Sequence, residues 1–285
     1  NTLIGALEPL ERTDGRGIQF IPFIERQFVW GDAPGEAASS DPRAITQPWI
    51  GILHVPFEAP RWFSFELSPE SIFTTDLWKR SRPYCRGIIT LARDLEADLN
   101  VADSELPTLS VLHPKAFGAA MFDLMSYQAN PRVIQVGDWV RKLQAIHRLR
   151  APGHERIMLT KQHTGHYLGR EIAKFGDFLD PSVNVRYLVS NDEYDQLLSS
   201  SVVLCLLYGT AANNVVIECI ARATPIIINP LPAAVEYLGR GYPLYARDEV
   251  EADSLLEDSE KVIQAHAYLL SRRSEIDLTY EGFSR

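Results

Sequence analysis

The residues best suited to binding chemistry follow an apolar run at 202–206. Thr210 lies in the short loop after this run, and Asn213 and Asn214 precede a helical pattern at 215–223. Thr and Asn are favoured at helix N-caps, and a helix start presents unpaired N–H groups together with the positive end of the helix dipole. The spacing therefore predicts a diphosphate site at this helix start, with Thr210, Asn213 and Asn214 around it.

Glu218 lies about one turn inside the same predicted helix, among Val, Ile, Cys and Ala residues. A carboxylate is costly to bury in such surroundings unless it meets hydrogen-bond donors, and sugar hydroxyls are donors of this kind. We therefore predict that Glu218 binds a sugar. The alternative is that Glu218 lies on the solvent face or forms an ion pair with Arg222, one turn later.

Cations follow two other predicted strands. After the first of these strands, a turn at Gly137 precedes Arg141 and Lys142, and Lys161 directly follows the second. Open α/β sheets bind ligands at the carboxyl ends of their strands. These three cations are therefore candidates to neutralise phosphate groups, and the alternative for Arg141 and Lys142 is a solvated helix start.

In the first half of the chain, His54 lies at the end of a predicted strand at 49–55, beside Pro and aromatic residues. A histidine at a strand end can polarise an acceptor hydroxyl or form a hydrogen bond with a sugar. We predict that His54 is the catalytic residue of this half. The alternative is a histidine with a structural role only.

The second half of the chain alternates strand patterns with helix patterns. Its strands are continuous apolar runs, which are typical of a parallel sheet covered by helices on both faces. They are expected at 132–136, 156–160, 184–188, 202–206 and 225–228. The first half has shorter strands, expected at 18–24, 49–55, 87–91 and 108–112. It also has a turn-rich loop, expected at 31–48. A proline after the last of these strands indicates a domain junction, so we predict one domain at 1–115 and a doubly wound α/β domain at 116–285.

The composition is that of a globular protein with two domains. The chain has 285 residues, of which 46% are hydrophobic and 23% are charged. Its net charge of -9 argues against a protein that coats nucleic acid, and nothing in the sequence indicates membrane contact. The three cysteines are too few and too widely spaced for a disulfide framework. We expect a reducing, cytoplasmic compartment and buried thiols at Cys205 and Cys219.

The segment 213–236 resembles the C-terminal domain of retaining GT-B glycosyltransferases of the glycosyl transferases group 1 family. In that family a Glu-x7-Glu motif precedes a Pro-led apolar strand and then a turn followed by another Glu. Glu218 matches the second Glu of the motif, and the strand at 225–228 and the turn at 231–236 match the rest. The first Glu is replaced, because Thr210 stands eight residues before Glu218.

The resemblance implies an α/β protein of the GT-B fold, with two Rossmann-like domains facing across a cleft and a reduced N-terminal domain. It implies transfer of a sugar from a UDP-, GDP- or dTDP-linked donor to a hydroxyl of a glycan, lipid or natural product, as in polysaccharide biosynthesis. Transfer would retain configuration and would need no metal or other cofactor. Arg141 and Lys142 would neutralise the donor diphosphate, Glu218 would hold the ribose, and the backbone of Val189 would lie against the base.

Two other functions stay open at this point. A sugar-nucleotide epimerase shares the architecture and needs acidic residues around the sugar, where Thr210 removes one candidate. A non-catalytic protein that binds a sugar or a partner is favoured by the same replacement. The sequence contains no Gly-x-x-x-x-Gly-Lys-Ser phosphate loop, no Gly-x-Ser-x-Gly elbow, no His-Glu-x-x-His helix and no Asp-x-Asp.

Overall fold

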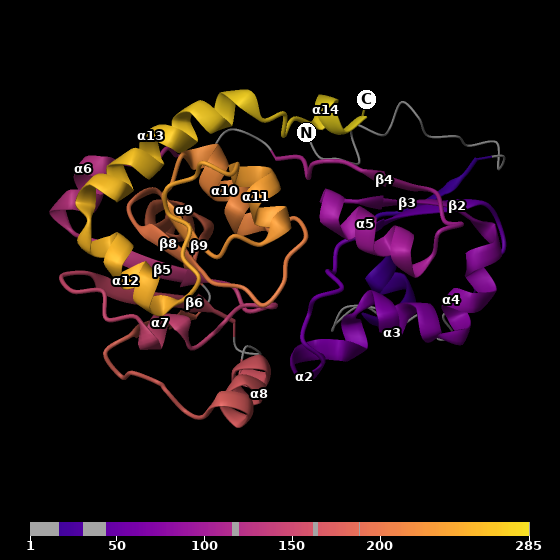
Figure 1. Ribbon diagram of the computed structural model, residues 1–285, viewed down its shortest axis with the longest axis horizontal. Helices are drawn as coiled ribbons and strands as arrows, with labels where there is room; N and C mark the ends of the chain where they lie inside the picture. Colours follow the sequence, from indigo (N-terminus) through magenta and orange to yellow (C-terminus); the bar gives the residue numbers. More distant parts are fainter. Residues whose placement is uncertain (1–16, 31–43, 116–119, 162–164, 188, 285) are drawn as a thin grey trace. The chain divides into compact units, whose positions relative to one another are not determined.

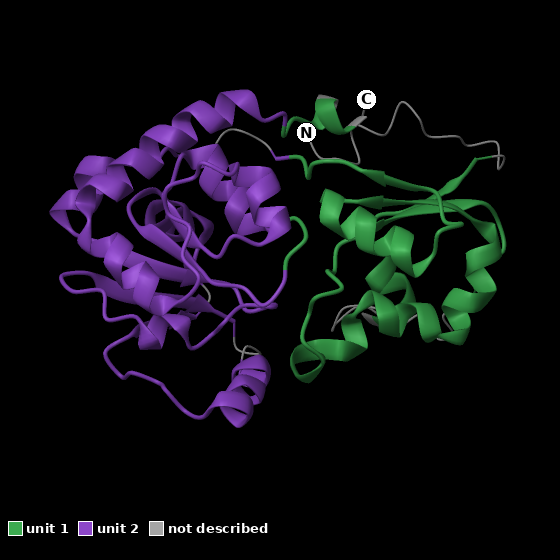
Figure 2. Cartoon of the chain, viewed as in Figure 1, with its two compact units in different colours: residues 1–114, 210–212, 278–285 green, residues 115–209, 213–277 purple. Residues whose placement is uncertain are grey.

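The structure is a computed structural model that describes residues 17–30, 44–115, 120–161, 165–187 and 189–284 (Figure 1). The loop expected at 31–48 falls outside these residues over 31–43. The chain forms two compact units (Figure 2). Unit 1 comprises residues 1–114, 210–212 and 278–285, and unit 2 comprises residues 115–209 and 213–277.

Unit 1 contains a four-stranded parallel sheet in the order β1-β2-β3-β4, so each strand pairs with its neighbour along the chain. The strands are β1 (Gln19–Ile21), β2 (Trp49–Leu53), β3 (Cys85–Thr90) and β4 (Thr108–Ser110). The helical segments of this unit are η2 (Arg26–Trp30), α2 (Arg61–Ser64), η3 (Phe65–Leu67), α3 (Pro69–Thr74), α4 (Asp76–Ser81), η4 (Arg82–Tyr84), α5 (Arg93–Ala102) and α14 (Tyr280–Ser284).

The strand expected at 18–24 is wrong in its second half. β1 ends at Ile21, and the chain then turns into the helical segment η2. Phe28 of η2 is buried, and its ring centroid lies 5.8 Å from that of Trp49 in β2 and 5.2 Å from that of Trp78 in α4. Burial of aromatic rings is worth more than the few ladder hydrogen bonds that a longer edge strand would add, so packing decides the local structure here.

Unit 2 contains a five-stranded parallel sheet in the order β7-β6-β5-β8-β9. Its strands are β5 (Arg132–Val136), β6 (Glu155–Thr160), β7 (Asn184–Tyr187), β8 (Val202–Cys205) and β9 (Ile226–Ile228). Its helices are α6 (Leu124–Ala129), α7 (Ala145–Arg148), α8 (Gly165–Phe175), α9 (Asn191–Ser199), α10 (Asn214–Arg222), α11 (Pro232–Leu238), α12 (Glu249–Glu257) and α13 (Ser259–Glu275). β8 and β9 are buried along their whole length, which confirms the doubly wound α/β domain expected from the apolar runs.

The strand order of unit 2 reverses beside β5. The chain leaves β5 toward β6 and β7 on one side, and it then returns to place β8 and β9 on the other side. In doubly wound sheets, ligands bind outside the carboxyl ends of the strands at such a reversal. The topology therefore selects the loops after β5 and β8 as the place for a site.

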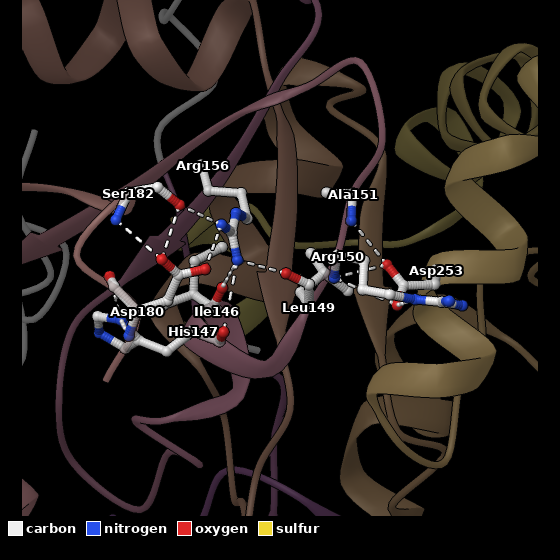
Figure 3. A network of polar contacts seen from close by, with 9 residues as sticks. All are labelled: Ile146, His147, Leu149, Arg150, Ala151, Arg156, Asp180, Ser182 and Asp253. Atoms are coloured by element: carbon white, nitrogen blue, oxygen red, sulfur yellow. Dashed lines mark hydrogen bonds and ion pairs between the residues drawn. The ribbon is translucent and has the colours of Figure 1, made fainter. Parts of the chain in front are cut away.

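A network of polar contacts fixes the segment that follows the loop after β5 (Figure 3). The guanidinium of Arg156 donates to the carbonyl of Leu149 (2.5 Å) and to the carboxylate of Asp180 (2.6 Å). The carboxylate of Asp253 in α12 accepts from the backbone N–H of Ala151 (2.8 Å), which has a positive φ of 43°. These bonds hold a strained turn between α7 and β6 in one conformation.

The described residues also bear on two expectations from composition. All three cysteines are buried free thiols, which confirms the expectation for Cys205 and Cys219. Burial raises the pKa of both thiols above the ordinary value of a cysteine. In the described part of the chain, no helix combines the length and the apolar character needed to cross a membrane.

Candidate functional site

The glycine turn after β5 makes room for a buried arginine. Gly137 has a φ of 80°, and a Cβ atom placed there would lie only 2.9 Å from Cζ of Arg141. Glycine therefore satisfies both the backbone conformation and the approach of the guanidinium without strain. Arg141 is 9% exposed; its Nη1 donates to the carbonyl of Trp139 (2.9 Å) and its Nη2 to Oδ1 of Asn213 (3.3 Å).

The same guanidinium keeps hydrogen-bonding capacity for a ligand. Nε of Arg141 is buried and has no hydrogen-bond partner within the described residues, and no described carboxylate forms an ion pair with this side chain. Buried polar groups in native proteins are nearly always hydrogen-bonded, and buried charges are nearly always paired. An anion bound beside Arg141 would compensate its charge.

The N-terminus of α10 lies next to this arginine. Asn213 is the N-cap, and its side-chain oxygen accepts from the N–H of Val215 (3.0 Å) as well as from Arg141. The N-cap and helix start expected from the sequence are thus confirmed. The first N–H groups of an α-helix have no partner within the helix, so those around Asn213 and Asn214 add their positive dipole end to the charge of Arg141.

The loops after β5 and β8 are joined by backbone hydrogen bonds. The N–H of Lys142 donates to the carbonyl of Leu206 (2.9 Å), and the N–H of Tyr208 donates to the carbonyl of Val140 (2.8 Å). Between them, Arg141 pairs with the residue after Leu206 in an antiparallel bridge. Each loop therefore restrains the other, and Arg141 is held from both sides.

Two buried polar side chains support these joined loops. The carboxylate of Glu171 in α8 accepts from the N–H of Leu143 (2.7 Å) and from the hydroxyl of Tyr208 (2.9 Å). The side chain of Asn229, just after β9, accepts from the N–H of Leu207 (2.8 Å) and donates to its carbonyl (2.9 Å). Burial raises the pKa of Glu171, and the hydrogen bonds from Tyr208 and Leu143 offset part of that rise.

The carboxylate of Glu218 in α10 is held by two hydrogen-bond donors. Its side chain is 15% exposed, and its two oxygens accept from Nζ of Lys115 (2.9 Å) and from the hydroxyl of Tyr194 (2.6 Å). The alternative reading of Glu218 is wrong in both forms, because the side chain is largely buried and Arg222 pairs instead with Asp195 (2.5 Å). Burial, reinforced by the nearby carboxylate of Glu218, raises the pKa of Tyr194 well above its ordinary value.

The structure limits what Thr210, eight residues before Glu218, can offer to a ligand. The residue is buried, and its hydroxyl donates to the carbonyl of Ala211 (2.8 Å). With its proton engaged, the hydroxyl can only accept a further hydrogen bond. Thr210 belongs to unit 1, whereas Asn213 belongs to unit 2.

The remaining predicted residues of unit 2 lie at separate strand ends. Lys142 is half-buried and adjoins Arg141 in the joined loops. Lys161 is exposed at the end of β6, and Val189 is half-buried just before Ser190, which caps α9. Since β6 and β7 lie on one side of β5, the structure brings Gly137, Arg141, Lys142, Asn213 and Asn214 together, with Lys161 and Val189 farther along the same sheet edge.

His54 of unit 1 follows β2 and is held by two neighbours. Its ring stacks on that of Phe23, with a centroid distance of 3.9 Å and an interplanar angle of 6°. Its Nδ1 lies 3.4 Å from a carboxylate oxygen of Glu25, whose side chain is completely buried. Glu25 carries no signal in the sequence, because the two residues are 29 positions apart.

Several site residues were missed by sequence reasoning, and one of them had a usable signal. Glu171 has Leu168 three residues before it and Phe175 four residues after it, a spacing that puts the acid on the apolar face of α8. An acid on such a face needs donors, so its buried role could have been predicted. Lys115 had no such signal, because it is 103 residues from Glu218.

Among the described residues, no group of three or more His, Cys, Asp or Glu side chains is arranged to hold a metal ion.

Comparison with known proteins identifies the fold. No protein-family model and no curated protein matches this sequence. Among solved structures, sucrose-phosphate synthase from Thermosynechococcus elongatus matches with a TM-score of 0.63 at 13% identity, over 83% of this chain and 65% of that chain. HepE from Anabaena, solved with UDP-glucose, matches with a TM-score of 0.58 at 15% identity, over 80% of this chain and 68% of that chain. The trehalose-6-phosphate synthase OtsA matches with a TM-score of 0.59 at 15% identity, over 99% of this chain and 73% of that chain.

This chain has the GT-B fold. The two parallel sheets described above are the cores of its two Rossmann-like units, which confirms the fold class implied by the resemblance. The chain spans about two thirds of the length of sucrose-phosphate synthase, 65%. At these identities, the similarity to GT-B structures establishes architecture and not activity.

Proposed function

We propose that this GT-B protein is a glycosyltransferase that moves a sugar from a nucleotide-sugar donor to a hydroxyl acceptor. The observation that carries the proposal is the guanidinium of Arg141. It is buried, its Nε has no partner within the described residues, and it lies within hydrogen-bond distance of the N-cap of α10 at the reversal of the strand order. The structure of HepE with UDP-glucose supports a nucleotide sugar as the ligand class.

The diphosphate of the donor would bind to Arg141, Lys142 and the N–H groups of Asn213 and Asn214. When the bond between the sugar and the diphosphate breaks, negative charge grows on the departing phosphate oxygen. Fixed cations and a helix N-terminus stabilise that charge without having to reorganise. We propose transfer with retention of configuration, in which this phosphate oxygen accepts the proton of the attacking hydroxyl. Lys161 would add a second phosphate cation, and the backbone of Val189 would lie against the base.

Glu218 would bind the ribose of the donor. A ribose diol offers two hydroxyl donors, and Glu218 already has two donors in this structure, Lys115 and Tyr194. Lys115 is the more replaceable partner, because its side chain is 32% exposed. We expect the ribose to take the place of Lys115 while the hydroxyl of Tyr194 keeps the carboxylate in position.

A thermal-shift panel of UDP-, GDP- and dTDP-linked sugars tests the binding part of the proposal. At least one donor should raise the unfolding temperature, since a ligand that binds only the folded state stabilises it by mass action. Glu218→Gln should weaken the affinity for that donor by about 10- to 100-fold, the range for losing a hydrogen bond to a charged group. Asp195→Asn is the matched control. It also removes a carboxylate that is paired with a cation, and the cation is the guanidinium of Arg222 on α10.

Two results would contradict this assignment. One is a panel in which no nucleotide sugar stabilises the wild type. The other is a Glu218→Gln variant that binds the donor as tightly as Asp195→Asn does.

The reaction itself is tested by incubating the donor with and without a mixture of hydroxyl acceptors. Consumption of the donor that depends on an acceptor supports the transferase. Conversion of the donor alone to an isomer would indicate a sugar-nucleotide epimerase. Binding without any turnover would indicate a non-catalytic protein, for which the replacement of the first motif acid by Thr210 would be the reason.

A further inference from the structure

The side chain of His54 is fixed in both position and orientation. The ring of Phe23 covers one face of the imidazole, and Nδ1 points to Oε2 of Glu25 at 3.4 Å. The other carboxylate oxygen of Glu25 accepts from the backbone N–H groups of His54 and of Val55, the latter at 2.9 Å. The carboxylate is thus anchored to the backbone of the same strand end that carries the imidazole.

This arrangement determines which nitrogen of His54 carries the proton. A carboxylate oxygen can only accept a hydrogen bond, so Nδ1 of His54 must be the donor. In the neutral imidazole the other nitrogen, Nε2, then has a lone pair and can only accept. Within the described residues Nε2 has no hydrogen-bond partner, and the side chain is 21% exposed. A ligand that meets this nitrogen of the neutral imidazole must therefore present a donor.

We propose that Glu25 is a positioning residue that holds His54 in the Nδ1–H tautomer, so that Nε2 accepts a hydrogen bond from a hydroxyl of the acceptor substrate. The proposal rests on the transferase function, because it names the group of the acceptor that His54 binds. Buried carboxylates commonly set the tautomer and direction of functional histidines in this way. No proton leaves the hydroxyl in this step; His54 orients the acceptor, and Glu25 acts only through His54.

Glu25→Gln separates this role from a purely structural one. The amide has nearly the same shape as the carboxylate, and its oxygen can still accept from the N–H groups of His54 and Val55. Its –NH2 group now faces Nδ1 and donates, so Nδ1 must accept and the proton moves to Nε2. The variant keeps the packing and reverses the hydrogen-bonding character of the exposed nitrogen. Glu70→Gln is the matched control in unit 1, since its carboxylate pairs with Arg61 at the surface.

The first measurement is the tautomer, which needs neither donor nor acceptor. The protein is labelled with 15N at histidine, and the ring signals of His54 are assigned by comparison with a His54→Gln variant. We expect a protonated Nδ1 and an unprotonated Nε2 in the wild type and in Glu70→Gln, and the reverse in Glu25→Gln. A protonated Nε2 in the wild type, or an unchanged tautomer in Glu25→Gln, would overturn the proposal.

The second measurement is transfer at varied concentrations of an acceptor that the wild type uses. Glu25→Gln should raise the KM for the acceptor about tenfold or more. With the proton on Nε2, the hydroxyl must turn and accept, and its own proton then loses the acceptor that Nε2 provides in the wild type. The dissociation constant of the donor should stay as in the wild type. An unchanged KM in a variant with a reversed tautomer would overturn the role toward the acceptor.

The two measurements also distinguish this proposal from the function on which it rests. If no nucleotide sugar binds and no transfer occurs, the transferase fails, and the acceptor role of His54 fails with it. The tautomer measurement would still decide whether Glu25 orients His54. If transfer occurs but the tautomer is not the expected one, the positioning role alone is refuted.

Discussion

Replacement of Gly137 by alanine tests whether the glycine turn exists to admit Arg141. The φ of 80° at this position is unfavourable for any residue with a Cβ, at a cost of about 1–2 kcal/mol. The added Cβ would also lie 2.9 Å from Cζ and 3.2 Å from Nε of Arg141, which is too close. The guanidinium must then shift, and we expect this to weaken or break its bonds to Trp139 and Asn213, at up to about 0.5–1.5 kcal/mol each.

Gly153→Ala is the matched control for this substitution. Gly153 has a similar φ of 76°, but no atom lies within 4 Å of a Cβ built at that position. The backbone penalty is therefore shared by the two variants, and only the displacement of Arg141 differs. We expect Gly137→Ala to lower the free energy of unfolding by about 1–3 kcal/mol more than Gly153→Ala does.

The assay combines urea unfolding of both variants with calorimetric titration of the nucleotide that binds the wild type. Gly137→Ala should weaken nucleotide affinity by about 10- to 100-fold, since a charge-assisted hydrogen bond is lost, and Gly153→Ala should bind as the wild type does. Equal stability losses and equal affinities in the two variants would refute the reasoning, because Arg141 would then neither depend on Gly137 nor bind the nucleotide.

Two further predictions concern the groups that support the site. Glu171→Leu removes both acceptor oxygens, so the hydroxyl of Tyr208 and the N–H of Leu143 lose their partner. We expect a loss of about 1–3 kcal/mol in unfolding free energy and weaker nucleotide binding. Wild-type affinity would show that Glu171 does not position the loops. The second prediction concerns the pH dependence of stability. Burial lowers the pKa of His147 below its ordinary value of 6.5. Its Nδ1 accepts from the N–H of Asp180 (3.1 Å). As the pH falls from 7 through 6.5 the unfolded chain takes up a proton that the native state refuses, so the free energy of unfolding falls. His147→Asn keeps an acceptor and does not titrate there, so its unfolding free energy should change less between pH 7 and 5; a slope equal to that of the wild type would contradict this cause.

The helix start at Asn213 was predictable because capping depends on residues only a few positions apart. The side-chain oxygen of Asn213 and the N–H of Val215 meet as soon as the helix begins. The buried strands β8 and β9 were predictable for a similar reason, since a continuous apolar run can be satisfied only by covering both faces. Both patterns depend on residues that are close together in the chain.

Expectations about the partners of charged groups succeeded less well. Arg222 is the nearest cation to Glu218 along the helix, yet Arg222 pairs with Asp195 and Glu218 pairs with Lys115. The reason is burial, because a charge that lies in the interior takes the donor that packing places beside it. Proximity in sequence selects partners only on an exposed helix face.

The sequence by itself determined the alternation of strands and helices, the buried thiols and the helix start that carries Asn213. Tertiary structure alone decided that β8 lies beside β5, which is what brings that helix start within hydrogen-bond distance of Arg141. It also decided the setting of Glu218 and of His54, whose partners Lys115 and Glu25 are 103 and 29 residues away. Local patterns follow from neighbours within one or two turns, whereas the order of strands in a sheet depends on how the whole chain closes.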